Sequence, residues 1–595
     1  MQISLCFRHA VVYMRAFRQA ARVALTSLGL LRTVQLLRIY LREGSRGLRR
    51  NRLNDALPQR AAAFAERHAK TFRSVRAETA PDARRVLVVG DNLSACIELE
   101  LCFAKALELA GWRTLRLHEP DSSKTAADAI ATYYRLLDSA ELLDWDDNFD
   151  PSGFRSQAES IVDGAGSLEE LLAFETGAVR VGGHAISTAR RQLRAGAVDL
   201  EKIADRHKLT ECVASSLASA EGFARLVGEL GPSLILTVDT AYTPRAEMLD
   251  VCVRMGIPVI RWYVAHKDSA VMLKRYTAAN RDQDINSLSP VSWQFVCNME
   301  WSAARHDKLM RELSAGYARK DWYNQDGAQF NKRQIDAADL RKRLGLDPSR
   351  KTAIVFPHVA YDASFGRGED LFPGYDEWLV ETIKVACANE NVQWVIRIHP
   401  AHLGKHLDVR HVPDEEAVLR RQFGDLPRHV SIIPAGSDIS TLSLFSIMDY
   451  CLTVRGTVGI EAACRGIPVL TGGTGRYDRK GFTIDSVSAA EYLDRLARIQ
   501  DIAPLLPAQI ELAGRFAYGL FLLRPLPLTN MTVAYDKESA AENFSNPVEI
   551  RPKTRKDWET APDLKAFVEW ATGSDSEDFL LPDLPDTDEL PGHAP

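Results

Sequence analysis

Short apolar runs of strand length alternate with amphipathic stretches of helix length along most of the chain. In the first half the expected strands are Arg85 to Gly90, Trp112 to Leu117, Ser233 to Asp239 and Ile257 to Ile260. A helical pattern over Ser94 to Ala110 separates the first two, and the stretch from Ser122 to Glu229 predicts mainly helix. Strands that alternate with helices predict a parallel sheet.

The second half repeats this alternation. Its expected strands are Thr352 to Phe356, Val392 to Ile398, Val430 to Ile433, Tyr450 to Val454 and Pro468 to Leu470. Helical patterns cover Tyr375 to Asn389 and Glu415 to Phe423, and a further helix at Pro507 to Leu523 is expected to pack back across both halves. The pattern therefore predicts two doubly wound domains with a ligand cleft at the C-terminal ends of their strands.

A chain of 595 residues is too long for one ordinary core. We predict an α/β protein with two Rossmann-like domains facing across a cleft. The expected parts are a basic helical extension (1–80), an N-terminal Rossmann-like domain with a helical insertion (81–335), a C-terminal Rossmann-like domain (336–525) and a C-terminal extension with an acidic disordered tail (526–595).

The two ends differ from the middle. Residues 1–55 hold eleven arginines and no lysine, interleaved with apolar residues at helical spacing, which predicts a basic amphipathic helix or helix pair. It either lies on an anionic membrane surface or packs on the body of the protein. Gly573 to Pro595 holds seven acidic residues, four prolines and no Lys or Arg, which predicts a flexible, disordered tail.

Composition narrows the chemistry. The nine cysteines are scattered without a C-x-x-C pair, which favours reduced core residues and argues against a zinc site. No apolar run is long enough to predict a transmembrane helix. We expect a cytoplasmic protein, either free or peripheral on the inner face of the membrane. Outside residues 1–55 no basic and aromatic stripe suggests a nucleic-acid partner.

The segment from Thr453 to Val469 predicts a strand, a glycine-containing turn, a helix and the next strand. Gly456 allows close approach of a ligand, and Thr457 is expected to cap the helix, whose free amides would face an anion such as a diphosphate. Glu461, one turn later, is placed to accept hydrogen bonds from ribose hydroxyls. The alternative is an ordinary helix start.

His399 ends the preceding buried strand, because Pro400 forces the chain out of the sheet. At that edge His399 is expected to donate to a leaving phosphate and to stabilise the charge that develops there, with Arg397 and Arg455 contributing positive charge. The alternative for His399 is a structural role.

Two further sets complete the candidate site. The glycine-rich loop Thr471 to Phe482 either wraps the sugar or nucleotide or is a mobile surface connection; its candidate donor-binding residues are Gly472, Gly473, Tyr477 and Lys480. On the N-terminal side, Asp239 and Asp91 stand at predicted strand ends, where either would serve as the general base or as a helix-capping residue.

The segments Ile398 to Pro400, Arg455 to Glu461 and Tyr477 to Phe482 resemble those of bacterial capsule polysaccharide biosynthesis proteins, including Kdo-transferring and related glycosyltransferases of the GT-B fold. The resemblance covers roughly Lys351 to Leu496. At the position of His358, those proteins often carry an asparagine.

This resemblance implies transfer of a sugar from a nucleotide-sugar to a capsular or surface polysaccharide or its lipid-linked (glycolipid) acceptor, without a tightly bound metal or other cofactor. It also implies that residues 81–335 form the acceptor-side domain and residues 336–525 the nucleotide-sugar-binding domain. The alternatives are a polyol-phosphate transferase of the teichoic-acid type, a sugar-nucleotide epimerase, or a non-catalytic scaffold in a capsule assembly or export complex.

Overall fold

The computed structural model describes most of the chain beyond its first 55 residues. The described residues are 56–91, 93–117, 124–145, 149–324, 327–362, 365–402, 415–534 and 547–582. The predicted basic amphipathic segment over 1–55 lies outside them, so both interpretations of that segment stay predictions.

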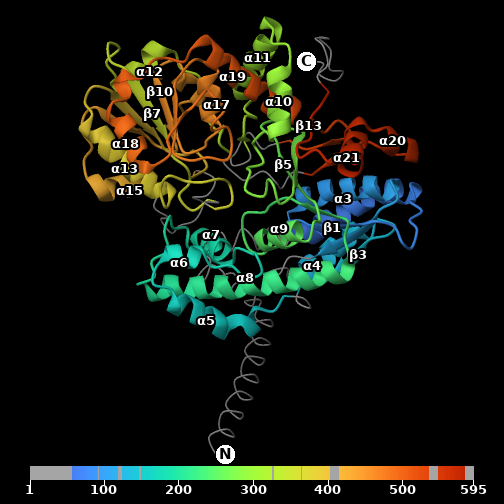
Figure 1. Ribbon diagram of the computed structural model, residues 1–595. Coiled ribbons are helices and arrows are strands. Elements are labelled where there is room, and N and C mark those ends of the chain that lie inside the picture. The colour runs from blue at the N-terminus through green and yellow to red at the C-terminus, as the bar shows by residue number, and fades with distance from the viewer. Residues whose placement is uncertain are drawn as a thin grey trace, which may run out of the picture.

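The first domain is built on a seven-stranded sheet (Figure 1). Its order is β13(Leu526–Pro527), β6(Ala270–Tyr276), β5(Val259–Val264), β4(Leu234–Thr237), β1(Arg85–Val89), β2(Arg113–Leu117) and β3(Glu141–Leu143). The five strands from β5 to β3 are parallel, as predicted. Strands β6 and β13 add an antiparallel edge that the sequence pattern does not predict.

Helices cover both faces of this sheet. They are α3(Ser94–Leu109), α4(Lys124–Tyr134), η1(Pro151–Phe154), α5(Arg155–Gly164), α6(Leu168–Leu172), α7(Val181–Leu193), α8(Ile203–Leu230) and α9(Arg245–Arg254). Within β1, Val86 and Val88 face a core shared with α3, whereas Leu87 and Val89 face a core shared with α7 to α9. This alternation follows from the two-residue period of a strand and explains why the whole run is apolar.

The second domain has a six-stranded, fully parallel sheet. Its order is β12(Ile484–Asp485), β11(Val469–Thr471), β10(Tyr450–Thr453), β7(Thr352–Phe356), β8(Gln393–Arg397) and β9(Val430–Ile433). The helices around it are α12(Ala337–Leu344), α13(Tyr375–Ala388), α15(Glu415–Phe423), α16(Thr441–Leu444), α17(Val458–Ala463), α18(Ala489–Ala497) and η3(Ile499–Asp501). The predicted arrangement of two Rossmann-like domains is confirmed.

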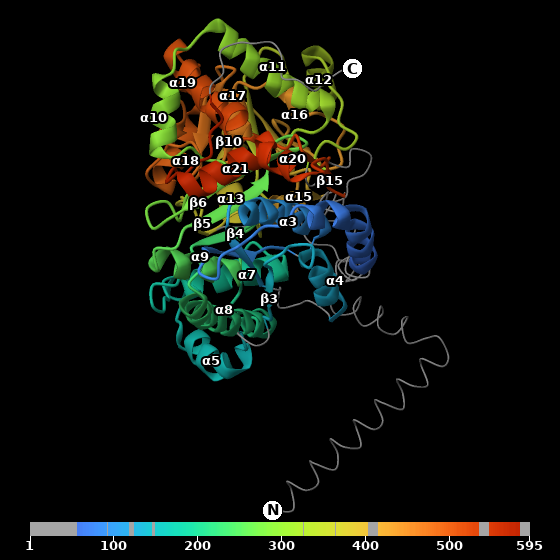
Figure 2. The same cartoon turned by 90° about the vertical axis from the view of Figure 1, so that its right-hand side faces the viewer.

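The chain crosses between the domains twice. After β6 it runs through α10(Pro290–Asn298) and α11(Ala303–Arg319), whose apolar side chains belong to the core of the second domain. It returns through α19(Pro507–Tyr518) and the π-helical turn η4(Gly519–Leu523) to β13 on the first sheet. Figure 2 shows α10, α11 and α19 gathered around the second domain.

The C-terminal extension packs on the first domain. It contains the hairpin β14(Met531–Thr532) and β15(Glu549–Ile550), followed by α20(Arg555–Thr560) and α21(Pro562–Gly573). Helix α21 lies against α3 in both views (Figures 1 and 2). A helix over residues 56–74 completes this layer, with Phe72 packed edge-on against Trp558 at 5.3 Å.

Residues 574–582 depart from the prediction of a flexible tail beginning at Gly573. Asp578 and Phe579 are buried, and the amide of Arg275 in β6 donates to the carbonyl of Glu577 at 2.7 Å. Composition did not predict this order, because the carboxylate of Asp578 pairs with Lys274 and Arg524, two buried cations from distant parts of the chain. Residues 583–595 lie outside the described part.

None of the described helices combines the length and the apolar character needed to cross a membrane.

Candidate active site

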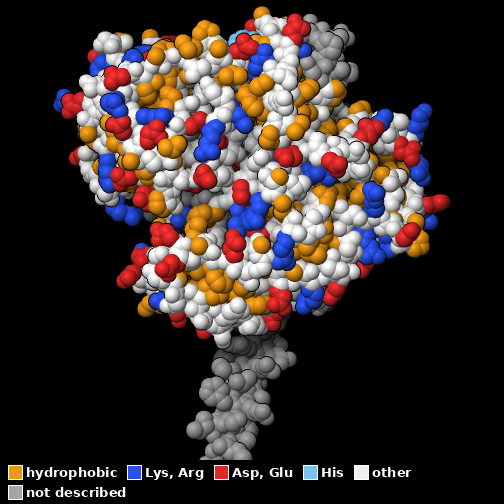
Figure 3. Space-filling view, in the orientation of Figure 1, with side chains coloured by type: hydrophobic (Ala, Val, Ile, Leu, Met, Phe, Trp, Pro, Cys, Tyr) orange, Lys and Arg blue, Asp and Glu red, His pale blue; other side chains and the backbone are white. Residues whose placement is uncertain are grey.

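A cavity of about 460 Å³ lies between the two domains. Its walls include residues that directly follow β1, β4, β7, β8 and β10, so it opens at the C-terminal edges of both sheets. Figure 3 shows acidic and basic side chains gathered where the two lobes meet. The expected cleft therefore exists as a charged cavity, and eight of the predicted site residues line it: Asp91, Asp239, Arg397, His399, Arg455, Gly456, Thr457 and Glu461.

The end of β8 supplies the first basic group. Arg397 is buried, and its Nη1 donates to the carbonyl of Pro434 at 2.8 Å. Its Nε is buried without a partner, and Nη2 has none among the described residues. Burial lowers the pKa of Arg397 to about 10. Two residues later, the Nδ1 atom of His399 accepts the amide of Ala401 at 3.2 Å, which fixes the ring at the cavity wall.

The turn after β10 brings Arg455, Gly456 and Thr457 to the cavity. The prediction that Thr457 caps α17 is wrong: it has helical angles (φ −60°, ψ −22°) and makes no capping hydrogen bond, because a capping residue needs an extended backbone. The amides of Thr457 and Val458 nevertheless have no acceptor in the described part of the chain. Two backbone donors at the cavity wall are thus left for a ligand.

Glu461 lines the cavity and is 1% exposed. Its carboxylate accepts the hydroxyl of Tyr317 at 2.9 Å and the indole Nε1 of Trp322 at 3.1 Å. Burial raises the pKa of Glu461 to about 7, because these donors and Arg465 offset only part of the desolvation. Each oxygen keeps a lone pair for a further donor, and the contact with ribose hydroxyls stays a prediction.

The glycine-rich loop Thr471 to Phe482, after β11, contacts residues of the cavity wall. Gly472, Gly473, Tyr477 and Lys480 do not line the cavity. Tyr477 donates to the carbonyl of Gly456 at 2.7 Å, and a Cβ on Gly472 or Gly473 would collide with Trp378 or Asp370. Lys480 lies over the ring of Trp293 at 5.8 Å. The predicted direct role of these four residues in donor binding has no support from their positions.

On the N-terminal side, Asp239 and Asp91 line the cavity. Oδ1 of Asp239 accepts the amides of Thr240 and Ala241 at 2.7 and 3.1 Å and lies 3.7 Å from Arg261. Its other oxygen has no partner among the described residues. Asp239 therefore combines the turn-forming role of an ordinary aspartate with one oxygen available for a proton.

Most positive charge around the cavity is already balanced. Of the six arginines that line it, five form an ion pair: Arg191 with Asp362, Arg261 with Asp239, Arg367 and Arg476 with Asp284, and Arg455 with Asp370. Arg397 is the exception among the described residues. A buried cation without a counter-charge is costly unless a ligand supplies the anion.

Several of these partners were not among the predicted site residues. Asp284 comes from the loop after β6, and Arg367 and Arg476 reach it from the second domain. Although burial opposes it, the two guanidiniums hold the pKa of Asp284 far below its usual range. Arg367 and Arg476 both lie in glycine-rich segments, which was the only sequence signal for them.

His358 also reaches the cavity wall. Its Nε2 accepts the backbone amide of Arg455 at 3.3 Å. Burial, with the charges of Arg476 and Arg455, holds its pKa well below the usual value. His358 is therefore a neutral acceptor that fixes the turn leading to Gly456.

No group of three or more His, Cys, Asp or Glu side chains is arranged for a metal ion in the described part of the chain. Catalysis without a tightly bound metal or cofactor stays a prediction. The eight described cysteines form no disulfide, and six of them are buried.

Comparisons with known proteins complete the description. No protein-family model and no curated protein sequence matches the chain. Among solved structures it is similar to two Kdo transferases of Thermosulfurimonas dismutans KpsC. The β-Kdo 2,4 transferase is 13% identical over 51% of this chain and 82% of its own, with a TM-score of 0.31. The β-Kdo 2,7 transferase is 15% identical over 54% and 85%, with a TM-score of 0.32.

The chain is also similar to the UDP-GlcNAc 2-epimerase of Neisseria meningitidis bound to UDP-GlcNAc. That match is 10% identical over 73% of this chain and 97% of the other, with a TM-score of 0.24. At such identities and TM-scores the likeness carries no information on activity. The conclusion that two Rossmann-like domains face each other across a charged cavity therefore rests on the strand order and the cavity walls.

Proposed function

We propose that this protein is a glycosyltransferase that moves a sugar from a nucleotide-sugar to a capsular or surface polysaccharide or its lipid-linked acceptor. The observation that carries the proposal is the state of Arg397, a buried cation at the cavity wall with a free Nη2 and no acidic partner among the described residues. With the free amides of Thr457 and Val458, it forms a set of donors suited to a phosphate.

The proposed chemistry assigns a separate role to each wall. An acceptor hydroxyl attacks the anomeric carbon while the bond from that carbon to the phosphate oxygen breaks, and the bonding electrons leave with the phosphate. Oδ2 of Asp239 takes the hydroxyl proton, with Asp91 as the alternative base. Arg397 and His399 stabilise the negative charge on the departing phosphate.

Glu461 would bind the ribose in this scheme. Tyr317 and Trp322 hold its carboxylate in place, so its remaining lone pairs have a fixed direction. A fixed acceptor next to the phosphate donors favours a nucleotide over a simple sugar phosphate.

The proposal is tested by binding. Purified protein is screened by thermal shift and calorimetry against UDP-, GDP-, CDP- and CMP-linked sugars. One class should raise the unfolding temperature, and Arg397→Met should weaken its binding by about 10- to 100-fold, since a hydrogen bond to a charged group contributes roughly 1.5–3 kcal/mol. Arg421→Met, an exposed arginine on α15, is the matched control and should bind like the wild type. A folded sample that binds no nucleotide would contradict the proposal and favour a scaffold.

Turnover then separates the enzymatic alternatives. With the nucleotide-sugar and a polysaccharide acceptor, His399→Ala should lower the transfer rate by about 10²- to 10³-fold, the usual effect of removing one oxyanion donor. Folding stability should change far less. Equal activity of the variant would remove His399 from the mechanism. Release of CMP with a phosphorylated product would instead indicate a polyol-phosphate transferase, and conversion of the donor without acceptor would indicate an epimerase.

A further inference from the structure

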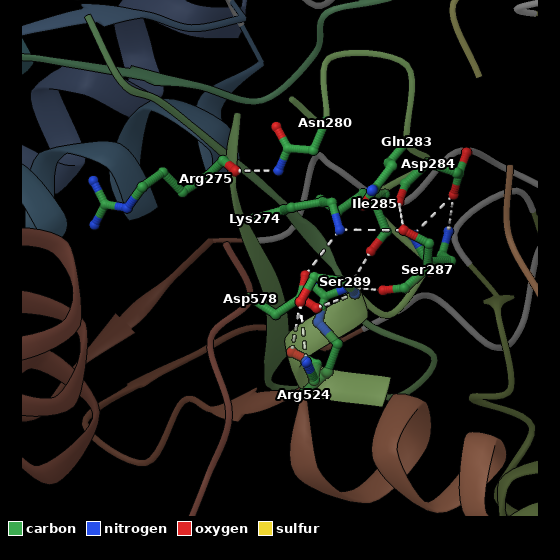
Figure 4. A network of polar contacts seen from close by, with 12 residues as sticks. Lys274, Arg275, Asn280, Gln283, Asp284, Ile285, Ser287, Ser289, Arg524 and Asp578 are labelled. Carbon is green, nitrogen blue, oxygen red and sulfur yellow. Dashed lines mark hydrogen bonds and ion pairs between the residues drawn. The ribbon is translucent and has the colours of Figure 1, made fainter. Parts of the chain in front are cut away.

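The two crossings between the domains meet at a cluster of buried charges (Figure 4). Lys274 lies in β6, at the start of the first crossing, and Arg524 follows η4, at the end of the second. Both side chains are fully buried. We call Lys274, Arg524 and Asp578 the hinge cluster.

Asp578 balances both cations. Its Oδ1 lies 2.9 Å from the ammonium of Lys274 and 3.4 Å from the guanidinium of Arg524. It is the only carboxylate in the described part of the chain that forms an ion pair with either. Its Oδ2 accepts the amide of Ser289, just before α10, at 2.7 Å. The C-terminal segment 574–582 thus lies along the edge of β6, where Lys274 and Asp578 form an antiparallel bridge, and it supplies the carboxylate that balances both crossings.

The hinge cluster continues to the cavity through the loop 277–289. Arg524 donates to the carbonyls of Ile285 and Ser287 at 2.5 and 2.6 Å, and Lys274 donates to the hydroxyl of Ser287 at 3.2 Å. That hydroxyl donates to the carbonyl of Asp284 at 2.6 Å. The backbone that carries the cavity residues is therefore held by the two buried cations.

On the other side of this loop, Asp284, Ile285 and Asn286 line the cavity. The carboxylate of Asp284 pairs with Arg476 at 3.1 Å and with Arg367 at 3.7 Å, and both of these arginines line the cavity as well. Among the described residues, Asp284 is the only acidic partner of these two arginines, so a displacement of the loop would move the counter-charge of both.

We propose that Asp578 is a positioning residue for the ligand site: by neutralising Lys274 and Arg524 it fixes the loop 277–289, and through Asp284 it fixes Arg367 and Arg476 in the cavity. Without the carboxylate, two buried cations repel each other and the loop that they hold moves. Affinity for a nucleotide then depends on a C-terminal segment that contributes no cavity residue. Only the nucleotide-binding measurement used to test this inference rests on the proposed function.

The test compares the full chain with point variants and with two shortened chains. Asp578→Asn removes the charge but keeps an oxygen for the amide of Ser289, and Asp575→Asn, an exposed acid of the same segment, is the control. A chain ending at Gly573 is compared with one ending at Pro582. The double variant Lys274→Met, Asp578→Asn restores the original net charge of the hinge cluster.

Calorimetry with UDP, GDP, CDP and CMP gives the first readout. For whichever nucleotide binds the wild type, Asp578→Asn and the chain ending at Gly573 should lose at least about tenfold in affinity, which corresponds to about 1.4 kcal/mol. Asp575→Asn and the chain ending at Pro582 should stay within about twofold, and the double variant should recover part of the loss. Wild-type affinity of a folded Asp578→Asn protein would overturn the inference; if that variant does not fold, wild-type affinity of the chain ending at Gly573 would do so.

Hydrogen–deuterium exchange gives a readout that needs no ligand. Asp578→Asn should speed exchange in the peptide covering 277–289, and Asp575→Asn should not. If the wild type binds none of the four nucleotides, the proposed function fails, but faster exchange still supports the positioning role. Unchanged exchange in 277–289 overturns that role whatever the nucleotides do.

Discussion

Two buried carboxylates, one at the hinge and one at the ligand site, respond to burial in opposite ways. Asp578 is 2% exposed and Glu461 is 1% exposed. Although burial acts to raise it, Arg524 and Lys274 hold the pKa of Asp578 far below its usual range. Burial raises that of Glu461 to about 7, because the charge of Arg465 and the neutral donors Tyr317 and Trp322 offset only part of the desolvation.

The difference lies in the partners. A carboxylate between two buried cations stays ionised, and its loss leaves uncompensated charge. A carboxylate held by neutral donors sits near the midpoint of its titration at neutral pH. The arrangement of Asp578 suits a residue that holds two chain segments in place. The arrangement of Glu461 suits a residue that binds a polar ligand.

The largest expected effect is at the hinge. Asp578→Ala should lower the free energy of unfolding by about 3–5 kcal/mol, because removing one partner of a buried ion pair strands the other charges. Chemical unfolding at pH 7 measures it. Asp575→Ala, at an exposed position of the same segment, should change the free energy by less than about 0.5 kcal/mol. Equal losses in the two variants would mean that the hinge carboxylate has no special role.

The contribution of Asp578 to the free energy of unfolding should disappear at acid pH. The folded-state pKa of Asp578 is depressed, so its contribution is present above the unfolded-state value of about 3.9 and is lost as the pH falls toward the folded-state value. The stability difference between the wild type and Asp578→Asn should therefore shrink below about pH 4. Unfolding midpoints from pH 7 to pH 3 test this, and a difference that stays constant would contradict the assigned pKa direction.

The second domain shows how far sequence alone reaches. The predicted strands Thr352 to Phe356 and Val430 to Ile433 match β7 and β9 residue for residue, because each is a short, mainly apolar run that follows a basic residue type and ends before a proline. The sequence also placed Arg397 and His399 at the correct edge of the sheet, because Pro400 forces the chain to leave the sheet directly after them.

The hinge shows where sequence falls short. Strand β6, which the sequence pattern does not predict, contains Lys274 and Arg275, and residues of these types are rarely buried, yet Lys274 is fully buried. Its partner, Asp578, lies 304 positions away in a segment whose acidic composition predicts a flexible tail. A pairing between charges so far apart leaves no pattern in the sequence around either residue. The same holds for Glu461, whose donors Tyr317 and Trp322 come from a different part of the chain.

Glu461 should give the opposite pH dependence to Asp578. Its folded-state pKa of about 7 lies above the unfolded-state value, so the folded protein binds the extra proton and stability falls as the pH rises from about 4.5 to 7. Glu461→Gln should remove this fall while keeping the size of the side chain. Unfolding midpoints across that range are the measurement. An unchanged slope in the variant would show that Glu461 titrates normally.

A third carboxylate, at the rim of the cavity, should give the smallest effect. Asp362 accepts the hydroxyl of Tyr242 at 2.8 Å and lies 3.7 Å from Arg191, so it links the second domain to the first. Its side chain is 46% exposed, however, and water screens the pair. Asp362→Asn should cost less than about 1 kcal/mol, and 0.5 M NaCl should reduce the cost further. A loss as large as that of Asp578→Ala would mean that partner charge, and not burial, decides what a contact between these domains contributes.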